Sequence, residues 1–577
     1  MKGGEKNKQV IHQLLLLSAL LFSGLEASAL SYDYTASVEC LENPHKPQYG
    51  GGVIINSELN EGLEGWSAFG DAKMEHKISA TNNFVVAHSR FQPFDSVSQT
   101  LHLENDKLYT FSAWIQVSEG KTSVRAVFKT KSGYKHAGSV VAKANCWSML
   151  KGGVTVDESG PADLYFESNN TSVDIWVDSI SLQPFTQEEW KSHQDESVNK
   201  MRKRKVRIQA VDTFGKPVAN ATVSVSQKRL GFPFGCAVNQ NILGNTAYQN
   251  WFSSRFTVTT FENEMKWASI ESTRGIEDYS IPDAMLKFTK SHGIGVRGHN
   301  VLWEDPQYLP RWVDSLSTND LKNAVTKRIY SIMRRYRGQV IGWDVVNENL
   351  HFSFFESKLG ARASELFYAV AQMIDPTHTM FMNEFNTVEE SRDSKATPSK
   401  YLEKLRSIKS SRSNTNLGIG LESHFGSGAP NLPYMRSAID TLAATGLPIW
   451  LTEVDVQSGG DQAKYLEQIL REGHSHPKVN GIVMWSAWSP QGCYRMCLTD
   501  NNFRNLATGD VVDKLLHEWG GRVEGKTDVN GFFEVSLFHG DYEVNLTPST
   551  GLPSSSSFKL ASTDGEPHQT TLLVRNS

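Results

Sequence analysis

Short runs of alternating apolar and polar residues dominate the chain between residues 48 and 185. Examples are LYTFSAWIQV, TSVRAVFK and VDIWVDSISL, and clusters of Gly, Asn, Asp and Ser separate them. A two-residue period with frequent turn residues is typical of strands that bury one face. The pattern therefore predicts an all-β sandwich over residues 48–185. The following stretch, 186–204, is highly charged, and we interpret it as a helical or flexible linker without a core of its own.

A different rhythm follows within residues 205–520. Apolar segments that end in polar residues recur throughout this region, and stretches with a helical period fill the gaps between them. Eight strands alternating with helices are typical of a (β/α)8 barrel, and we predict this fold for residues 205–520. The eight strand candidates are FGCAVN, FTVTTFEN, VRGHNVLW, VIGWDVVNE, MFMNEFN, LGIGLESHF, PIWLTEVDV and GIVMWSAW.

Two further β-rich pieces flank the barrel. Residues 206–227 precede it, and residues 525–548, within a C-terminal extension over 521–577, follow it. Neither piece is long enough to bury much core alone. VDTFGKPVANATVSV and GKTDVNGFFEVSLFHGDYEV resemble the two halves of a transthyretin-like or carboxypeptidase-regulatory-like sandwich. This resemblance implies one small split domain with the barrel inserted; independent tails are the alternative.

The N-terminus predicts export. Basic residues precede the apolar run LLLLSALLFSGL, and the small residues Ala27-Ser28-Ala29 follow it. This order is typical of a signal peptide, here residues 1–29, although an apolar core helix is an alternative. The apolar run is too short to cross a bilayer.

The net charge of -5, from 58 basic and 63 acidic residues, gives no field that favours binding to nucleic acid or to an anionic membrane.

Cysteines and glycosylation sequons fit an exported protein. In an oxidising compartment Cys40 could pair with Cys146, and Cys493 with Cys497, whereas Cys236 lies in an apolar strand and is interpreted as a core residue. The cysteine spacings match no metal signature. The sequons give candidate glycosylation sites at Asn169, Asn170, Asn220 and Asn545.

Polar side chains at the C-terminal ends of barrel strands are candidates for catalysis, because that rim carries the active site of such barrels. These positions hold carboxylates, carboxamides and indoles, with no Gly-rich phosphate loop and no evident cluster of metal ligands, so we expect no cofactor. Two Glu residues across a rim with aromatic plates suit glycoside hydrolysis. In this interpretation Glu348 is the proton donor, and Asn347 beside it holds a substrate hydroxyl.

Four motifs, WDVVNE, LTEVD, FENEMKW and RGHNVLW, resemble the signatures of family 10 glycoside hydrolases, the endo-β-1,4-xylanases. The resemblance spans the barrel in chain order. It implies Glu348 as acid/base, Glu453 as nucleophile, and net retention. His424 would hydrogen-bond the nucleophile, with Asp455 as support. The implied substrate contacts are Glu262, Asn263, Lys266, His299, Trp303, Asn347, Glu422, His424 and Trp485.

The chain departs from this family in three places. Glu422 stands where the family usually has Gln, and this added carboxylate beside Glu453 puts the pH dependence in doubt. Glu304 replaces a usual His, and we favour a structural role for it. The second Trp of the loop after strand eight is missing, and SPQGCYRMCLTD offers Tyr494 and Arg495 instead.

The N-terminal sandwich resembles carbohydrate-binding module family 22 through GGVIINSELNEGLEGWSAFG and DLYFES. This implies binding to xylan chains, with Arg90, Tyr134 and Glu167 as the contact residues. A structural sandwich with little affinity for sugar is the alternative.

The sequence thus predicts a secreted, monomeric, retaining endo-β-1,4-xylanase that acts on xylan or a related β-1,4-linked polysaccharide of a plant-type cell wall. Two alternatives stay open. One is a xylan endotransglycosylase, which passes the glycosyl group to another sugar chain instead of water. The other is a non-catalytic wall-binding protein, which the presence of both Glu residues disfavours.

Overall fold

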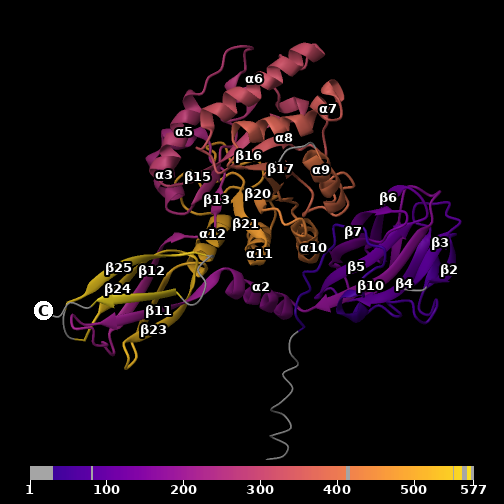
Figure 1. Cartoon of the computed structure of the whole chain (residues 1–577), viewed down its shortest axis with the longest axis horizontal. Coiled ribbons are helices and arrows are strands. Elements are labelled where there is room, and N and C mark those ends of the chain that lie inside the picture. Colours follow the sequence, from indigo (N-terminus) through magenta and orange to yellow (C-terminus); the bar gives the residue numbers. More distant parts are fainter. Residues whose placement is uncertain (1–29, 80–81, 411–415, 550–551, 562–567, 574–577) are drawn as a thin grey trace, which may run out of the picture.

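The computed structural model describes residues 30–79, 82–410, 416–549, 552–561 and 568–573 (Figure 1). The expected signal peptide, residues 1–29, lies outside this part. Among the described residues, no helix combines the length and the apolar character needed to cross a membrane.

The N-terminal domain is a sandwich of two antiparallel sheets, as the alternating pattern predicts. One sheet has the order β1 (Ser67–Phe69), β4 (Ser96–Leu103), β9 (Gly160–Glu167), β6 (Lys121–Thr130), β7 (Gly133–Lys143). The other has the order β2 (Lys73–Ile78), β3 (Asn83–His88), β10 (Ile175–Phe185), β5 (Leu108–Val117), β8 (Ser148–Val154). The domain begins before residue 48, because Leu41 pairs with Trp147 and a disulfide joins Cys40 to Cys146.

Residues 186–204, interpreted from their charge as a linker without a core, include the helix α2 (Gln187–Met201), which packs against the barrel. Thr186 and Glu189 form a capping box at its start. The Trp190 side chain is 2% exposed, and its indole N–H donates to the Glu472 carboxylate at 2.8 Å. The helical alternative is confirmed, but the expectation of no core was wrong, because a few apolar and amide side chains on one face suffice to bury a helix that is charged elsewhere.

The described part of the catalytic domain contains the eight strands of the predicted barrel. They run in the order β13 (Phe234–Cys236), β14 (Val258–Thr260), β15 (Gly295–Trp303), β16 (Gly342–Asn347), β17 (Thr379–Glu384), β18 (Leu417–Leu421), β20 (Ile449–Val456), β21 (Val479–Met484). Neighbours pair in parallel, and β21 pairs with β13 and β18 with β20, which closes the barrel. The short β19 (His424–Phe425) pairs with β20 at the rim.

Helices surround these strands, as Figure 1 shows. They are α3 (Thr246–Ser253), α4 (Trp267–Ile270), α5 (Ser280–Ser291), α6 (Thr318–Tyr336), α7 (Phe354–Leu359), α8 (Ala363–Ile374), α9 (Pro398–Ser410), α10 (Leu432–Ala443), α11 (Gln462–Ser475) and α12 (Ala507–Glu518). Short 3-10 turns are η1 (Gln48–Gly51), η2 (Gln240–Leu243) and η3 (Pro306–Tyr308). Because helices cover the outer face and side chains fill the interior, the strands are apolar runs that become polar only at their C-terminal ends.

The segments that flank the barrel in sequence pair with each other. β11 (Lys203–Val211) lies between β23 (Phe532–Phe538) and β26 (His568–Leu573) in one sheet. The second sheet has the order β22 (Arg522–Lys526), β12 (Thr222–Leu230), β24 (Gly540–Thr547), β25 (Ser554–Leu560). Val206 stands opposite Val535, and Val223 opposite Leu546. Figure 1 shows the strands that precede the barrel beside those that follow it.

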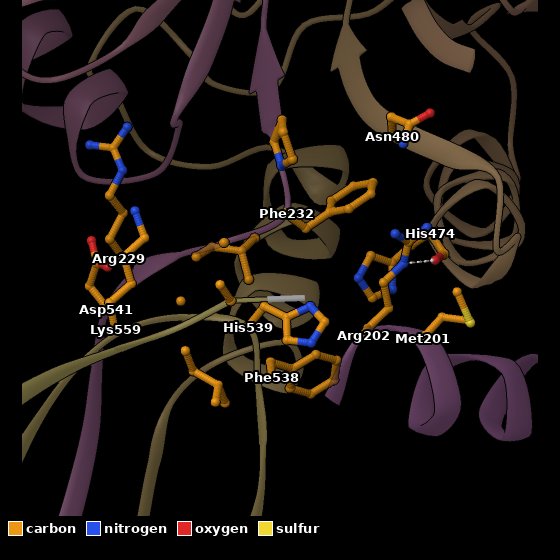
Figure 2. A pocket seen from close by; sticks show the side chains of 16 residues that line it. Met201, Arg202, Arg229, Phe232, His474, Asn480, Phe538, His539, Asp541 and Lys559 are labelled. Atoms are coloured by element: carbon orange, nitrogen blue, oxygen red, sulfur yellow. Dashed lines mark hydrogen bonds between the residues drawn. The ribbon is translucent and has the colours of Figure 1, made fainter. Parts of the chain in front are cut away.

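The seam between this split sandwich and the barrel contains a pocket (Figure 2). Arg202 crosses the seam, donating from Nε to the His474 carbonyl at 3.0 Å and from Nη2 to the Val479 carbonyl at 2.7 Å. Phe232 and Asn480, which lie at the N-terminal ends of β13 and β21, also line this pocket. It therefore lies at the end of the barrel that is opposite the catalytic rim, where side chains serve stability.

Deleting residues 521–577 should destabilise the protein. The deletion removes the neighbouring strands of β11 and β12 in the described sheets, and the fully buried side chains of Ile208 and Val223 would become exposed to water. We expect aggregation on size-exclusion chromatography and a lower melting temperature, compared with a control truncated after Leu573. A monodisperse deletion variant that melts with the control would contradict this arrangement.

Candidate active site

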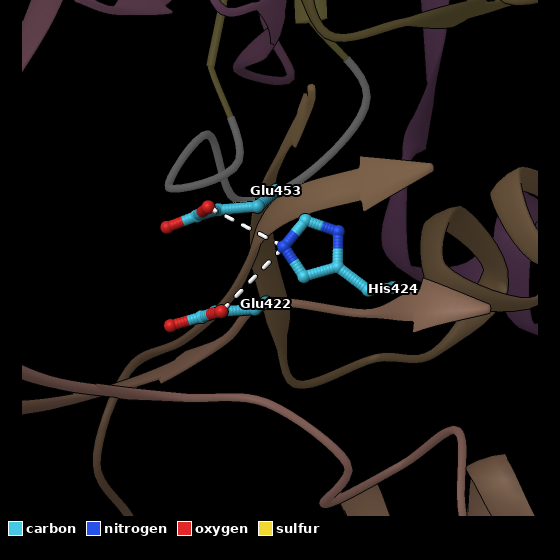
Figure 3. Close-up of side chains that lie close together, drawn as sticks. All are labelled: Glu422, His424 and Glu453. Carbon is cyan, nitrogen blue, oxygen red and sulfur yellow. Dashed lines mark ion pairs between the residues drawn. The ribbon is translucent and has the colours of Figure 1, made fainter. Parts of the chain in front are cut away.

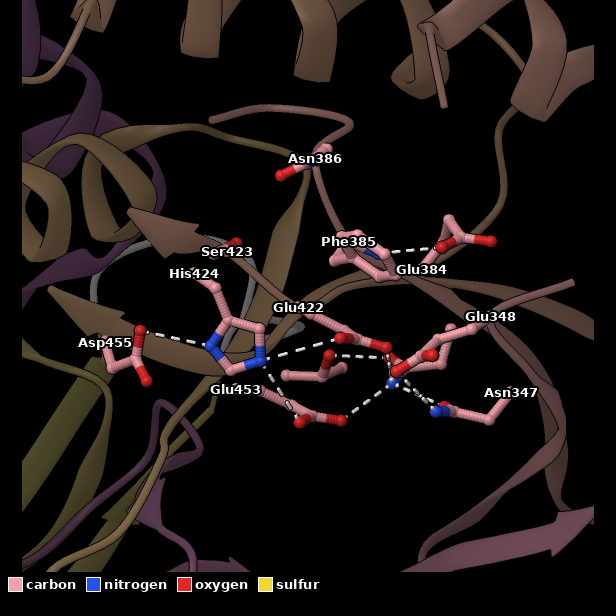
Figure 4. Close-up of polar contacts among 12 residues, drawn as sticks. Asn347, Glu348, Glu384, Phe385, Asn386, Glu422, Ser423, His424, Glu453 and Asp455 are labelled. Atoms are coloured by element: carbon pink, nitrogen blue, oxygen red, sulfur yellow. Dashed lines mark hydrogen bonds and ion pairs between the residues drawn. The ribbon is translucent and has the colours of Figure 1, made fainter. Parts of the chain in front are cut away.

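Glu348 and Glu453 come from different sides of the rim. Glu348 directly follows β16, and Glu453 lies within β20; the two residues are 9% and 6% exposed (Figure 4). Glu348 has a φ of 57°, a left-handed conformation that is rare for a residue with a side chain. Such conformations are costly and cluster at functional sites, where the surrounding structure holds them.

Asn383, at the end of β17, connects these carboxylates. Its amide nitrogen lies 2.9 Å from Glu453 Oε1, 3.0 Å from Asn347 Oδ1 and 3.1 Å from Glu422 Oε1. The Thr452 hydroxyl donates to Asn383 Oδ1 at 2.6 Å, which fixes the orientation of the amide. Asn383 is not among the residues predicted from the sequence motifs. The segment MFMNEFN nevertheless carries a signal, because it ends in polar residues as the other barrel strands do.

The two carboxyl groups have opposite electrostatic surroundings. Burial raises the pKa of Glu348 to about 8, and the charges of Glu384 and Glu453 act in the same direction. Burial alone would also raise the pKa of Glu453, but His299, His424 and Lys266 lower it to about 2. Near neutral pH, Glu348 is therefore protonated and Glu453 is ionised. Two carboxyls with pKa values held apart in this way can divide the roles of acid and nucleophile.

His424 lies between the carboxylates of Glu453 and Glu422 (Figure 3). Its Nε2 is 3.5 Å from Glu453 Oε2 and 3.5 Å from Glu422 Oε2, and its Nδ1 is 3.1 Å from Asp455 Oδ1. The ligand atoms of Glu422, His424 and Glu453 all lie within 4.8 Å of one another, a spacing that could hold a metal ion. Glu453 is separated in sequence from the other two residues and meets them only in the fold, so the spacing of the motifs could not reveal this cluster.

Burial raises the pKa of Glu422 well above its ordinary value, and the charges of Glu453 and Glu348 raise it further. For His424, burial lowers the pKa, but Asp455, Glu422 and Glu453 together raise it well above its usual value. Two carboxyls that share one imidazole and one amide cannot both ionise cheaply. The directions of both pKa shifts favour a neutral Glu422 beside a charged His424.

Aromatic and cationic side chains form one wall of the site. The Lys266 ammonium lies 4.6 Å from the Trp303 ring centre and 5.6 Å from that of Trp485, and it donates to Asn263 Oδ1 at 3.0 Å. The His299 ring contacts Trp485 edge to face at 5.5 Å. Burial and the charge of Glu264 raise the pKa of Glu262 to about 7. The structure thus gathers the candidate contacts from strands two, three and eight.

Asp344 and Glu304 are buried beneath the rim and contact residues that line it, and a structural role for Glu304 is the one favoured from the sequence. Asp344 is buried in β16 and pairs with Arg297 and with His299 Nδ1, the latter at 3.0 Å. Glu304 is fully buried and accepts the Phe355 backbone N–H at 2.8 Å and the Asn349 amide at 3.2 Å.

Of the candidate contacts in the N-terminal domain, Arg90 is buried. Its five N–H groups donate to five backbone carbonyls, those of Asp95, Asn170, Val173, Pro93 and Ser168. No donor is left for a sugar, so the carry-over from the resemblance is wrong for Arg90. Glu167 accepts the Tyr165 hydroxyl at 2.8 Å, whereas Tyr134 is 59% exposed.

The sequons at Asn169, Asn170, Asn220 and Asn545 all lie on exposed positions. Cys493 and Cys497 form a disulfide, and Cys236 is a buried free thiol.

We predict that Glu422→Gln extends the alkaline limb of the pH–rate profile. A neutral Glu422 can donate a hydrogen bond to Glu453, and it loses this ability when it ionises as the pH rises. Gln donates at every pH and has the same shape, so retention and substrate choice should not change. The measurement is kcat/KM against pH for both proteins. Superimposable profiles would show that Glu422 has only a structural role.

The chain is similar to known proteins over most of its length. The model of glycosyl hydrolase family 10 matches residues 223–502. Endo-1,4-beta-xylanase 5 of Arabidopsis thaliana is 42% identical over 561 residues, which cover 95% of each chain. Endo-1,4-beta-xylanase 5-like of the same organism is 40% identical over 569 residues, which cover 96% of each chain. Xylanase 10B from Thermotoga petrophila RKU-1, solved in complex with xylobiose, is similar with a TM-score of 0.45 and 22% identity over 50% of this chain and 94% of that chain. The chain belongs to glycosyl hydrolase family 10.

Proposed function

We propose that this protein is a retaining endo-β-1,4-xylanase. The observation that carries the proposal is the pair of buried rim carboxyls, Glu348 and Glu453, whose surroundings raise the pKa of the first and lower the pKa of the second. Membership of family 10 and the names of the full-length relatives support xylan as the substrate.

The proposed reaction has two displacements at one anomeric carbon. Glu453 attacks this carbon while Glu348 gives its proton to the leaving glycosidic oxygen, and a covalent glycosyl-enzyme forms. Glu348, now ionised, then takes a proton from a water molecule that attacks the same carbon and releases Glu453. Two inversions give net retention. Asn383 and His424, which contact Glu453, hold the nucleophile in place.

The substrate-binding roles follow from position. We propose that Trp303 and Trp485 pack against sugar rings, and that Glu262, Asn263, Lys266, His299 and Asn347 bind their hydroxyls. We also propose that residues 1–29 direct secretion to the cell wall and that the protein is monomeric. The N-terminal sandwich is proposed to bind xylan through Tyr134 and Glu167.

One incubation tests the function. The protein is mixed with xylan and a fluorescently labelled xylo-oligosaccharide, and the products are sized. We expect xylan to become shorter while the label stays on short chains. Transfer of the label to long chains would instead identify a transglycosylase, and an unchanged size distribution would identify a non-catalytic binding protein.

A further inference from the structure

The loop after β21 is closed by the Cys493–Cys497 disulfide and positions Arg495 beside the catalytic group. Two neighbouring residues of this loop differ in exposure: Tyr494 is 98% exposed to solvent, whereas the Arg495 side chain is only 23% exposed. Further hydrogen bonds hold the loop, because Gln462 donates to the Arg495 carbonyl at 3.0 Å and Thr508 to the Cys497 carbonyl at 2.6 Å.

Arg495 makes two contacts at the rim. Its Nε donates to Asp455 Oδ1 at 2.7 Å, and its Nη2 donates to the backbone carbonyl of Phe425. The guanidinium thus spans β20 and β19, the strands that carry Asp455 and His424. Guanidinium is always charged and has a rigid set of donors, so it can hold a carboxylate and a carbonyl in fixed relative positions.

The same Asp455 oxygen faces His424, whose Nδ1 is 3.1 Å away, and His424 Nε2 in turn is 3.5 Å from Glu453 Oε2. Polar contacts therefore lead from Arg495 through Asp455 and His424 to the nucleophile: the first is a hydrogen bond, and the next two are ion-pair distances without hydrogen-bond alignment. A carboxylate on one nitrogen of an imidazole fixes the orientation of the ring and the group that the other nitrogen faces. Asp455 is itself buried, and a buried carboxylate needs compensating partners.

We propose that Arg495 is a positioning residue for Glu453, acting through Asp455 and His424, and that the Cys493–Cys497 disulfide is the tether that holds it there. The inference rests on the proposed function of Glu453. It gives a role to the loop that departs from the family pattern. This loop lacks the second Trp of the family, and it instead holds the Arg495 guanidinium against the residues that position the nucleophile.

The test follows the first chemical step alone. A 2-deoxy-2-fluoro xylobioside with a good leaving group labels the nucleophile and then reacts on very slowly, so the labelling rate reports on Glu453. The variants are Arg495→Met, which fills similar space without charge, Arg495→Lys, and Cys493→Ser combined with Cys497→Ser. Cys40→Ser combined with Cys146→Ser is the control, because that disulfide lies in the N-terminal sandwich.

Arg495→Met should lower the labelling rate at saturation by roughly 10- to 100-fold, the effect of one charge-assisted hydrogen bond, with little change in the binding constant. Arg495→Lys should recover part of the rate, and the Cys493/Cys497 variant should fall between wild type and Arg495→Met. The control pair should label as fast as wild type.

Equal losses in the Met and Lys variants, or a change in the binding constant alone, would overturn the positioning role. A Cys493/Cys497 variant that labels at the wild-type rate would overturn the tether. If this variant does not fold, wild type reduced at this disulfide alone, as verified by peptide mapping, takes its place. Failure of the wild type to be labelled would instead refute the proposed function.

Discussion

Glu453→Ala is expected to abolish turnover of xylan, with a loss of roughly 10⁴-fold or more, as when a catalytic nucleophile is removed. Without the carboxylate no glycosyl-enzyme can form, and the positive charges that His424 and Lys266 direct at this position lose their partner. Reducing-sugar release from xylan measures the effect. The purified variant should be folded, with a circular dichroism spectrum like that of wild type.

An exogenous small nucleophile provides a sharper control for this variant. Azide can enter the space left by the side chain and attack the same carbon in one displacement, so an α-glycosyl azide should form from an activated substrate while Glu348 is intact. Near-normal hydrolysis by Glu453→Ala would show that the nucleophile is a different residue.

Glu348→Ala should have an effect that depends on the leaving group. On polymeric xylan, the loss of the acid should cost about 10²–10⁴-fold, because the departing sugar needs a proton. An aryl xylobioside with a good leaving group needs no proton, so its glycosylation step should be largely preserved. Comparing kcat/KM for the two substrates measures this, and equal losses on both would contradict the assignment.

The pH dependence gives a second view of Glu348. With its pKa raised to about 8, the acid keeps its proton below that pH and loses it above, so activity should fall as the pH rises through this value. The contribution of Glu348 to this alkaline limb should be absent in Glu348→Ala with the activated substrate, whereas the contribution of Glu422 should remain. Glu453, with a pKa of about 2, stays ionised through the same range.

The barrel was predictable because each strand is buried on both faces. A segment such as GWDVVN is apolar except at positions where a protein partner or a substrate can satisfy a polar side chain. The apolar run therefore identifies the strand, and the polar residues at its end identify the functional position. The sandwich was predictable for a different reason: in strands that bury only one face, apolar and polar residues alternate. The carboxyls Glu348 and Glu453 followed from strand ends and from motif resemblance.

Other features depend on contacts between distant segments and leave no local pattern. Asn383 serves three partners on three different strands or loops, and its own sequence neighbourhood does not reveal them. The resemblance implies a sugar contact at Arg90, because a motif cannot show that five backbone carbonyls surround this side chain. Trp190 was assigned to a linker because the Glu472 that receives its N–H is 282 residues away.

The stereochemistry of the first product tests the central claim most directly. Proton NMR of the anomeric signals, recorded within minutes of adding enzyme to a xylo-oligosaccharide, shows the new reducing end before it mutarotates. The two displacements proposed for Glu453 and Glu348 predict the β-anomer first, with carboxyls about 5–5.5 Å apart. A first product in the α-configuration would mean that water attacks directly, and it would contradict the role of Glu453 as nucleophile.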